Sequence, residues 1–238
     1  MEAEKEYLIH LFHIIGPLDC IKEKMNLLES FFEIKLPFNA EDRKMIDSIF
    51  RSVVSKTRKS LKILKNMIEK GKKRYGTEKY QKLVDAKNEL VIELERNCYG
   101  LISRLDSEVI QHDSSNESIS FFLLLKADLL RYITEWCNES ERLKMITRTQ
   151  NCYIQALNTA KMCYSPYSIV SLSISLNYSL FLYENNVSKK EAISIAQDIL
   201  NNANSGTKET SDDEFAESTK LIQTIKENTS LWIIHEGE

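Results

Sequence analysis

Apolar residues recur at spacings of three and four along most of the chain, which is the pattern of helices that bury one face. The pattern is clear over residues 169–183 and again over 193–200. No stretch of the chain indicates a convincing strand. The pattern therefore predicts an all-α protein of about nine helices, some of them longer than about 30 residues.

Glycine and proline mark the expected helix boundaries, because both residues interrupt helices. In chain order, the expected segments are a short helix before Gly16–Pro17, a helix over 18–34, a break over 36–39, a long helix to Lys70, a loop over 71–76 and a long helix over 77–109. Asn39 is expected to cap the helix that ends near Lys70, with Asp42 at its third position.

Further helix starts are predicted by three Ser-x-x-Glu sequences, in which each side chain bonds the other residue's backbone N–H. They are Ser114–Glu117, Ser188–Glu191 and Ser211–Glu214. Pro166 is expected at the first position of a helix, where its missing N–H costs nothing.

The composition argues against several classes of protein. The 238 residues include 6 Gly and 3 Pro, whereas average usage would give roughly 17 and 12. Gly-rich phosphate loops, dinucleotide-binding turns and β-sandwiches need more of both residues, and neither GxGxxG nor GxxxxGK[ST] occurs. No Ser-His-Asp, Cys-His or paired-carboxylate arrangement stands out, so we expect no catalytic residues and no enzyme activity.

Cysteine, histidine and the N-terminus carry expectations about location and metals. The five Cys lack CxxC spacing and predict reduced thiols in a cytoplasmic or nuclear protein. The acidic N-terminus does not resemble a signal peptide, and no apolar run is long enough for a membrane span. His10 and His13 share a helical face, but nothing in the sequence completes their coordination, so we expect neither a metal nor a cofactor.

Basic residues concentrate in one segment, although the net charge of the chain is only −3. Residues 51–74 contain ten Lys or Arg and one acid, Glu69. This polarity suggests a local anion site rather than a general nucleic-acid surface. Arg51 and Arg58 lie two turns apart on one helical face and could clamp a phosphate, although a solvated surface would give the same pattern.

A second segment, residues 121–132, is strongly apolar and nevertheless carries Lys126, Asp128, Arg131 and Tyr132. Charged groups on a core-like helix need partners. Asp128 could pair with Arg131 three residues later, or it could orient an Arg from another helix. The Tyr132 hydroxyl beside Arg131 would be a good donor to a phosphate.

Four blocks together resemble the 14-3-3 family. The pair Arg131–Tyr132 looks like the phosphate-binding helix of that family. Residues 176–184 are similar to its LNFSVFYYE, residues 218–232 to its STLIMQLLRDNLTLW, and residues 51–58 to its KNVVGARR. The blocks occur in family order, and the likeness covers about residues 38–232.

The resemblance implies a single domain over 1–233 with a short tail over 234–238, built from antiparallel helices around a concave amphipathic groove. It implies an adaptor that binds phosphoserine or phosphothreonine in client proteins and regulates their activity or localisation. The implied phosphate-binding residues are Arg51, Arg58, Arg131 and Tyr132. The implied groove residues are Lys126, Leu176, Asn177, Leu180, Glu184, Leu221, Asn228, Leu231 and Trp232.

Some positions depart from the family pattern. Lys220 and Thr224 replace Leu on the groove wall, Ser173 replaces a Gly and Leu124 replaces a Lys, so we expect a groove that is more polar on one side. At the implied dimer interface, Cys20 and Glu23 face Glu93 and Glu89, which removes one ion pair and makes another like-charged. The apolar residues Ile14, Ile15 and Leu18, with Lys87 nearby, still favour a homodimer.

Two alternatives remain open on the sequence. A helical-repeat scaffold similar to tetratricopeptide arrays would bind unphosphorylated peptides and would lack convergent cations. A protein with the basic face 56–74 could bind anionic membranes. The preferred interpretation has phosphorylated client proteins as partners, and neither nucleic acid nor membrane.

Overall fold

The computed structural model describes residues 2–18, 20–34, 38–112, 115–202 and 212–237. All regular structure in these ranges is helical, with ten α-helices, one π-helix and no strand. The predicted all-α class is confirmed, with one helix more than the nine expected. The chain divides into two compact units, residues 1–113 (unit 1) and 114–238 (unit 2).

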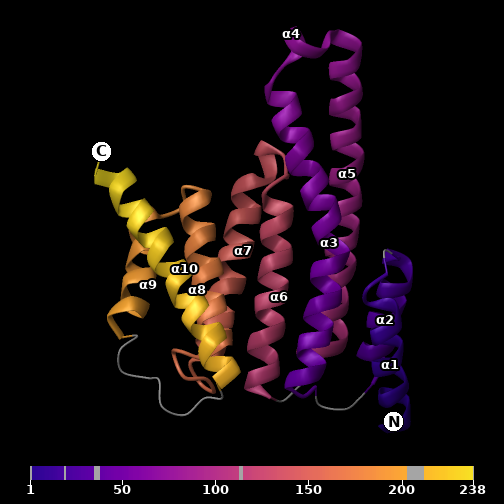
Figure 1. Cartoon of the computed structure of the whole chain (residues 1–238), viewed down its shortest axis with the longest axis vertical. Coiled ribbons are helices and arrows are strands. Elements are labelled where there is room, and N and C mark those ends of the chain that lie inside the picture. The colour runs from indigo at the N-terminus through magenta and orange to yellow at the C-terminus, as the bar shows by residue number, and fades with distance from the viewer. Residues whose placement is uncertain (1, 19, 35–37, 113–114, 203–211, 238) are drawn as a thin grey trace. The chain divides into compact units, whose positions relative to one another are not determined.

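Unit 1 is built on a long helical hairpin. Its elements are α1 (Glu2–Ile15), α2 (Ile21–Glu33), α3 (Ala40–Glu69), α4 (Lys72–Tyr75), α5 (Thr77–Arg104) and the π-helix η1 (Leu105–Ile110). Helices α3 and α5 run side by side, and α4 joins them (Figure 1). The predicted cap of α3 is confirmed, because the Asp42 N–H donates to Asn39 Oδ1 at 2.9 Å and the Asn39 N–H donates to Asp42 Oδ2 at 2.8 Å.

Two expectations for unit 1 are corrected. The segment 71–76 is not only a loop, since four of its residues form α4 between Gly71 and Gly76, whose φ angles are 78° and 74°. Positive φ is easily reached only by Gly, which is why two glycines flank this single turn. The helix expected to reach Val109 ends at Arg104, and the chain continues as η1.

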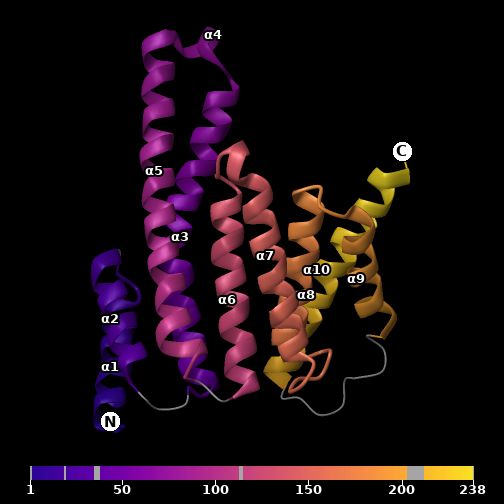
Figure 2. The same cartoon turned by 180° about the vertical axis from the view of Figure 1, so that it is seen from behind.

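The described residues of unit 2 form a bundle of five helices. They are α6 (Asn116–Thr134), α7 (Glu139–Ala160), α8 (Ile169–Glu184), α9 (Lys189–Asn202) and α10 (Asp212–Gly237). Helix α6 packs on α7 and α8, while α8 also packs on α9 and α10, and the reverse view shows the same order (Figure 2). Large side chains such as Phe122, Tyr153 and Phe181 are fully buried between these helices. The core of the unit therefore lies around α6, α7 and α8.

The helix starts of unit 2 match the sequence only in part. The Ser188 cap is confirmed by the Glu191 N–H, which donates to Ser188 Oγ at 3.2 Å. Helix α6 is capped by Ser115, whose Oγ accepts the Ser118 N–H at 3.5 Å. The predicted caps Ser114 and Ser211 lie outside the described residues. Helix α10 extends to Gly237, through most of the segment 234–238 that was expected to be a tail.

The expectation for Pro166 is wrong. Pro166 lies in a turn that the Ser168 N–H closes by donating to the Ser165 carbonyl at 3.0 Å. The following helix starts only at Ile169, because Ser168 is a better cap and accepts the Ser171 N–H at 3.2 Å. The fixed φ of proline suits the second position of such a turn as well as it suits a helix start.

Candidate functional site

The centre of the candidate site is Asp128, a carboxylate that is only 4 % exposed in α6. The Tyr153 hydroxyl of α7 donates to its Oδ1 at 2.6 Å. The Asn177 amide of α8 donates to both carboxylate oxygens at 3.0 Å. Three helices are therefore tied to one buried charge, and each of its oxygens has a donor, as a buried ion requires.

Arg131 is the cation of this cluster, and its side chain is 14 % exposed. Its Nη2 lies 3.6 Å from Asp128 Oδ1, and its Nε donates to the Tyr153 hydroxyl at 3.2 Å. The guanidinium also lies over the Tyr132 ring, 4.9 Å from the ring centroid. Of the two alternatives for Asp128, the structure shows the pair with Arg131 in the same helix. Arg131 and Tyr132, both predicted site residues, are thus brought together.

Both the charge of Arg131 and the proton of Tyr153 are held firmly. Burial opposes the charged form of Arg131, but its contacts with Tyr153 and Asp128 outweigh this effect, and the pKa of Arg131 is raised above its usual value. Burial raises the pKa of Tyr153 well above its usual value, and the neighbouring Asp128 raises it further. At neutral pH the cluster therefore contains a charged guanidinium and a neutral phenol.

A second tyrosine supports this cluster from α8. The Tyr178 ring stacks on Tyr153 at 5.6 Å between centroids. Its hydroxyl donates to Glu191 Oε1 at 3.0 Å and accepts from Gln150 Nε2 at 3.3 Å. Burial raises the pKa of Tyr178 to about 12, and Glu191 adds to that rise. The stack fixes the ring whose hydroxyl holds both Asp128 and Arg131.

One predicted groove residue, Trp232, takes part in an aromatic stack. Trp232 of α10 stacks on Tyr183 of α8 with centroids 4.6 Å apart and planes inclined by 15°. Lys189 Nζ lies 5.4 Å from the centroid of the Tyr183 ring and 2.7 Å from Glu236 Oε1. These contacts therefore connect α8, α9 and α10 around Trp232 and Tyr183.

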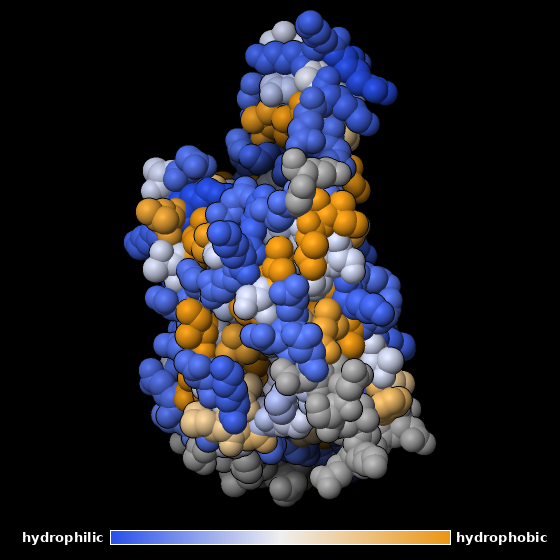
Figure 3. All heavy atoms as spheres, turned by 90° about the vertical axis from the view of Figure 1, so that its left-hand side faces the viewer, coloured by the Kyte–Doolittle hydropathy of each residue, from blue (hydrophilic) through white to orange (hydrophobic). Residues whose placement is uncertain are grey.

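The remaining groove residues of unit 2 differ in exposure. Leu176 is buried and Leu231 is 54 % exposed. The others are half-buried, except for the exposed Glu184; they are Lys126, Asn177, Leu180, Leu221 and Asn228. Figure 3 shows apolar side chains scattered among hydrophilic ones on the face that carries α9 and α10.

The arginines of unit 1 have different surroundings. Arg51 is 56 % exposed, and its Nε donates to Asp47 Oδ2 one turn earlier at 2.7 Å. Arg58 is half-buried and shares a face of α3 with Arg51. Both arginines belong to unit 1, whereas Arg131 and Tyr132 belong to unit 2, so the four predicted phosphate ligands are two local pairs.

The departures from the family pattern have distinct surroundings. Lys220 and Thr224 are both exposed on α10, and the Thr224 hydroxyl donates to the Lys220 carbonyl at 2.9 Å. Ser173 is half-buried. Leu124 is buried, so this replacement removes a charge without adding apolar surface. The polar character expected for one side of the groove therefore rests on Lys220 and Thr224.

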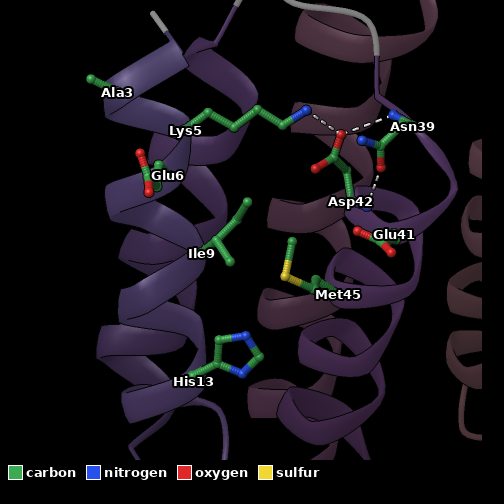
Figure 4. Close-up of a pocket in the computed structure, with 9 residues that line it drawn as sticks. All are labelled: Ala3, Lys5, Glu6, Ile9, His13, Asn39, Glu41, Asp42 and Met45. Atoms are coloured by element: carbon green, nitrogen blue, oxygen red, sulfur yellow. Dashed lines mark hydrogen bonds and ion pairs between the residues drawn. The ribbon is translucent and has the colours of Figure 1, made fainter.

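A pocket of about 600 Å³ lies elsewhere, between α1 and α3. Figure 4 shows Lys5 reaching Asp42 across it, with Nζ 2.6 Å from Oδ2. His13 lines it, together with Glu6 and Met45. None of the predicted site residues lines this pocket, and its ion pair also serves the cap of α3.

Sequence reasoning missed three supporting tyrosines, Tyr153, Tyr178 and Tyr183. Tyr153 was detectable, because it follows the spacing of buried residues in α7 and a buried phenol needs a partner. Tyr183 stood in an apolar stretch, and nothing there distinguished a stacking partner from an ordinary core residue.

No helix among the described residues is both long and apolar enough to cross a membrane. This finding concerns the described ranges only.

Comparison of the sequence with known proteins shows the family of the chain. The family model described as "14-3-3 protein" matches residues 12–233. The chain is 24 % identical over 232 residues to the 14-3-3-like protein GF14 epsilon of Arabidopsis thaliana, covering 98 % of this chain and 91 % of that protein. It is 23 % identical to the human 14-3-3 protein eta, covering 97 % and 94 %, and 22 % identical to the 14-3-3 protein 7 of Solanum lycopersicum, covering 98 % and 92 %. The chain belongs to the 14-3-3 family, whose members are phosphopeptide-binding adaptors.

Proposed function

We propose that this chain binds phosphoserine or phosphothreonine in client proteins and acts as an adaptor without catalytic activity. The observation that carries the proposal is Arg131, a guanidinium fixed by Asp128 and Tyr153 with one face against Tyr132. A fixed guanidinium fork matches the oxygens of a phosphate, and little side-chain entropy is lost when the phosphate binds.

The positive charges of the proposed site match the negative charge of a phosphate monoester. Such a group carries about −1.5 to −2 charges near neutral pH. We assign Arg51, Arg58 and Arg131 to its oxygens, with the Tyr132 hydroxyl as a further donor. Each charge-assisted hydrogen bond contributes about 1.5–3 kcal/mol. Because the second pKa of the phosphate is about 6, binding should weaken below that pH.

Asn177 is suited to the backbone of the bound peptide. Its amide nitrogen donates to Asp128, which orients its carbonyl oxygen as an acceptor for a peptide N–H. Asn228 would provide the matching contact from α10. The apolar wall of the groove would be formed by Leu176, Leu180, Leu221 and Leu231. Glu184 and Trp232 would support this wall, and Lys126 would lie beside it. Such a groove reads main chain and phosphate, and tolerates many flanking sequences.

We also propose a homodimer that forms through unit 1. Exposed apolar side chains of this unit support the proposal, because large ones on a protein surface often mark an interface. They are Tyr7, Ile14, Leu18, Ile63, Ile92 and Tyr99. Sedimentation should give a mass near twice 27.6 kDa, and a sharp boundary at the monomer mass at micromolar concentration would contradict the dimer.

The cytoplasm or the nucleus is the proposed location. All five cysteines are free thiols, which suits a reducing compartment. A fluorescent fusion retained in a secretory compartment would contradict this assignment.

The central experiment compares one peptide in phosphorylated and unphosphorylated forms by fluorescence polarisation. We expect the phosphorylated form to bind and Arg131→Ala to weaken binding by at least ~2 kcal/mol. Arg96→Ala is the matched control, since it removes an exposed guanidinium of α5 and should leave the affinity unchanged. Equal affinity for both forms would favour the helical-repeat scaffold instead.

A further inference from the structure

The α3–α5 hairpin of unit 1 has a distal part that no core covers. The buried residues of α3 end at Leu61, and those of α5 begin at Leu94. Every residue between these two positions is half-buried or exposed. Figure 1 shows α4 at the end of this hairpin. Residues 62–93 therefore form an arm, and the residues around its end, 70–82, are called the cationic tip below.

The cationic tip carries a dense positive charge. It contains six Lys or Arg and one acid, which gives it a net charge of +5. All six cations are exposed; they are Lys70, Lys72, Lys73, Arg74, Lys79 and Lys82. The acid, Glu78, lies 2.8 Å from Lys82 and neutralises that one cation. Figure 3 shows hydrophilic side chains crowding this end of the hairpin, at the top of the view.

Two tyrosines accompany these cations. Lys72 Nζ lies 5.4 Å from the centroid of the Tyr80 ring, and the Arg74 guanidinium lies 5.9 Å from that of Tyr75. Both tyrosines are half-buried. Tyr combines an apolar ring with a polar hydroxyl, and Lys and Arg combine apolar stems with charged heads. This is the composition found where proteins contact the headgroup region of a bilayer.

In contrast to the expectation from the sequence that no membrane is a partner, we propose that the cationic tip docks end-on onto a membrane surface that contains anionic phospholipids. Clusters of four to eight Lys or Arg bind such surfaces through the negative potential of the lipids. The tyrosine rings would lie at headgroup level, between the lysine stems. The proposal does not depend on phosphopeptide binding, because the tip contains none of the proposed phosphate ligands.

Charge and length favour a planar lipid surface over a nucleic acid. The whole chain carries −3, so the residues outside the tip carry a net −8. Apart from the basic stretch 51–69 of α3, this remainder repels a long polyanion that extends past the tip. Residues 62–69 of α3 add about 12 Å of helix beyond the last buried residue. That length exceeds the Debye length of about 8 Å, so end-on docking keeps the packed part of unit 1 screened from the lipid.

The test is co-sedimentation of the full chain with vesicles of phosphatidylcholine alone and of phosphatidylcholine with phosphatidylserine. We expect binding to the anionic vesicles only. The quadruple variant Lys70→Gln, Lys72→Gln, Lys73→Gln, Arg74→Gln should weaken partitioning at least tenfold. The control variant Lys144→Gln, Lys161→Gln, Lys190→Gln, Lys226→Gln removes the same charge from exposed positions of unit 2 and should stay within threefold of the parent.

Four results would overturn the proposal. Equal losses of vesicle binding in the two quadruple variants would mean a general charge effect. Binding to vesicles made only of phosphatidylcholine would show that anionic lipid is not required. Tip-dependent binding to a labelled DNA duplex without vesicle binding would assign the tip to nucleic acid. A change in sedimentation mass of the tip variant without vesicles would make the tip a contact between copies. Unchanged circular dichroism of the tip variant would show that its fold is intact.

Discussion

Two arginines that we propose to bind the same phosphate, Arg131 and Arg51, differ in burial and in the contacts that they make. Arg131 is 14 % exposed and touches a carboxylate, a phenol and an aromatic ring. Arg51 is 56 % exposed and has Asp47 one turn away. Arg131 is therefore oriented by buried partners before any ligand arrives, whereas Arg51 is an exposed cation that contacts Asp47 at the surface.

The comparison separates two tasks that one binding site must perform. A pre-oriented cation supplies geometry, because it does not have to be ordered again when the ligand binds. A solvated cation supplies charge, which attracts an anion over a longer range but selects little. Substitutions around Arg131 should therefore change the geometry of the binding site and the stability of the fold. Substitutions around Arg51 should mainly change the charge that is available to the phosphate.

The largest effect is expected from the carboxylate that holds Arg131. Asp128→Ala leaves a buried guanidinium without its counter-charge and removes the acceptor for Tyr153 and Asn177. The free energy of unfolding should fall by about 3–5 kcal/mol, as for other broken buried ion pairs. Asp47→Ala, which removes the partner of the exposed Arg51, should cost less than about 1 kcal/mol. Urea unfolding of both variants measures the difference, and similar losses would break the comparison.

The next effect concerns the shape of each cation. Arg131→Lys keeps the charge but loses the planar fork and the stacking on Tyr132. The Kd for a phosphopeptide should rise at least tenfold, which corresponds to about 1.4 kcal/mol. Arg51→Lys should leave the Kd within about threefold, because Arg51 is 56 % exposed and an exposed ammonium supplies the same charge. Fluorescence polarisation with one peptide tests both variants, and equal effects would assign the two arginines the same role.

The same contrast explains how much could be predicted from the sequence. Helical periodicity and the Asn39 cap are local signals, so the all-α class and the start of α3 were predictable. The pairing of Asp128 with Arg131 was one of two alternatives that the sequence left open, and it is the one that their spacing of three allows. Tyr153 lies in another helix, and its contact with both charges depends on how α6 and α7 pack. Sequence spacing carries no information about contacts between helices.

Local signals also failed where two of them competed. Pro166 suits a helix start and a turn equally well, and the hydroxyl of Ser168 decided between them. The glycines at 71 and 76 indicated a loop, yet the four residues between them close one helical turn. In both places the outcome depended on a hydrogen bond rather than on a residue preference.

Alkaline pH should reveal how much Tyr178, which supports the Arg131 cluster, contributes to stability. The pKa of Tyr178 is raised to about 12, so the folded protein favours the protonated phenol more than the unfolded chain does. This contribution to stability is complete below pH ~10, the unfolded value, and is lost as the pH rises toward 12. Tyr178→Phe cannot titrate there. Its free energy of unfolding should therefore fall less than that of the parent between pH ~9.5 and ~11.5, and parallel curves would show that Tyr178 does not contribute.

The smallest effect is expected from a third cation, the solvated Lys220 on α10. It is exposed beside Thr224, and we expect it to attract acidic residues of a bound phosphopeptide by charge alone. Lys220→Leu should reduce the preference for an acidic over an alanine-containing phosphopeptide by about threefold, and added salt should erase the difference in the parent. Lys226→Leu, which removes an exposed cation from the same helix, is the control. A preference that survives high salt would mean that Lys220 acts through fixed geometry, as Arg131 does, and that exposure alone does not separate the two kinds of cation.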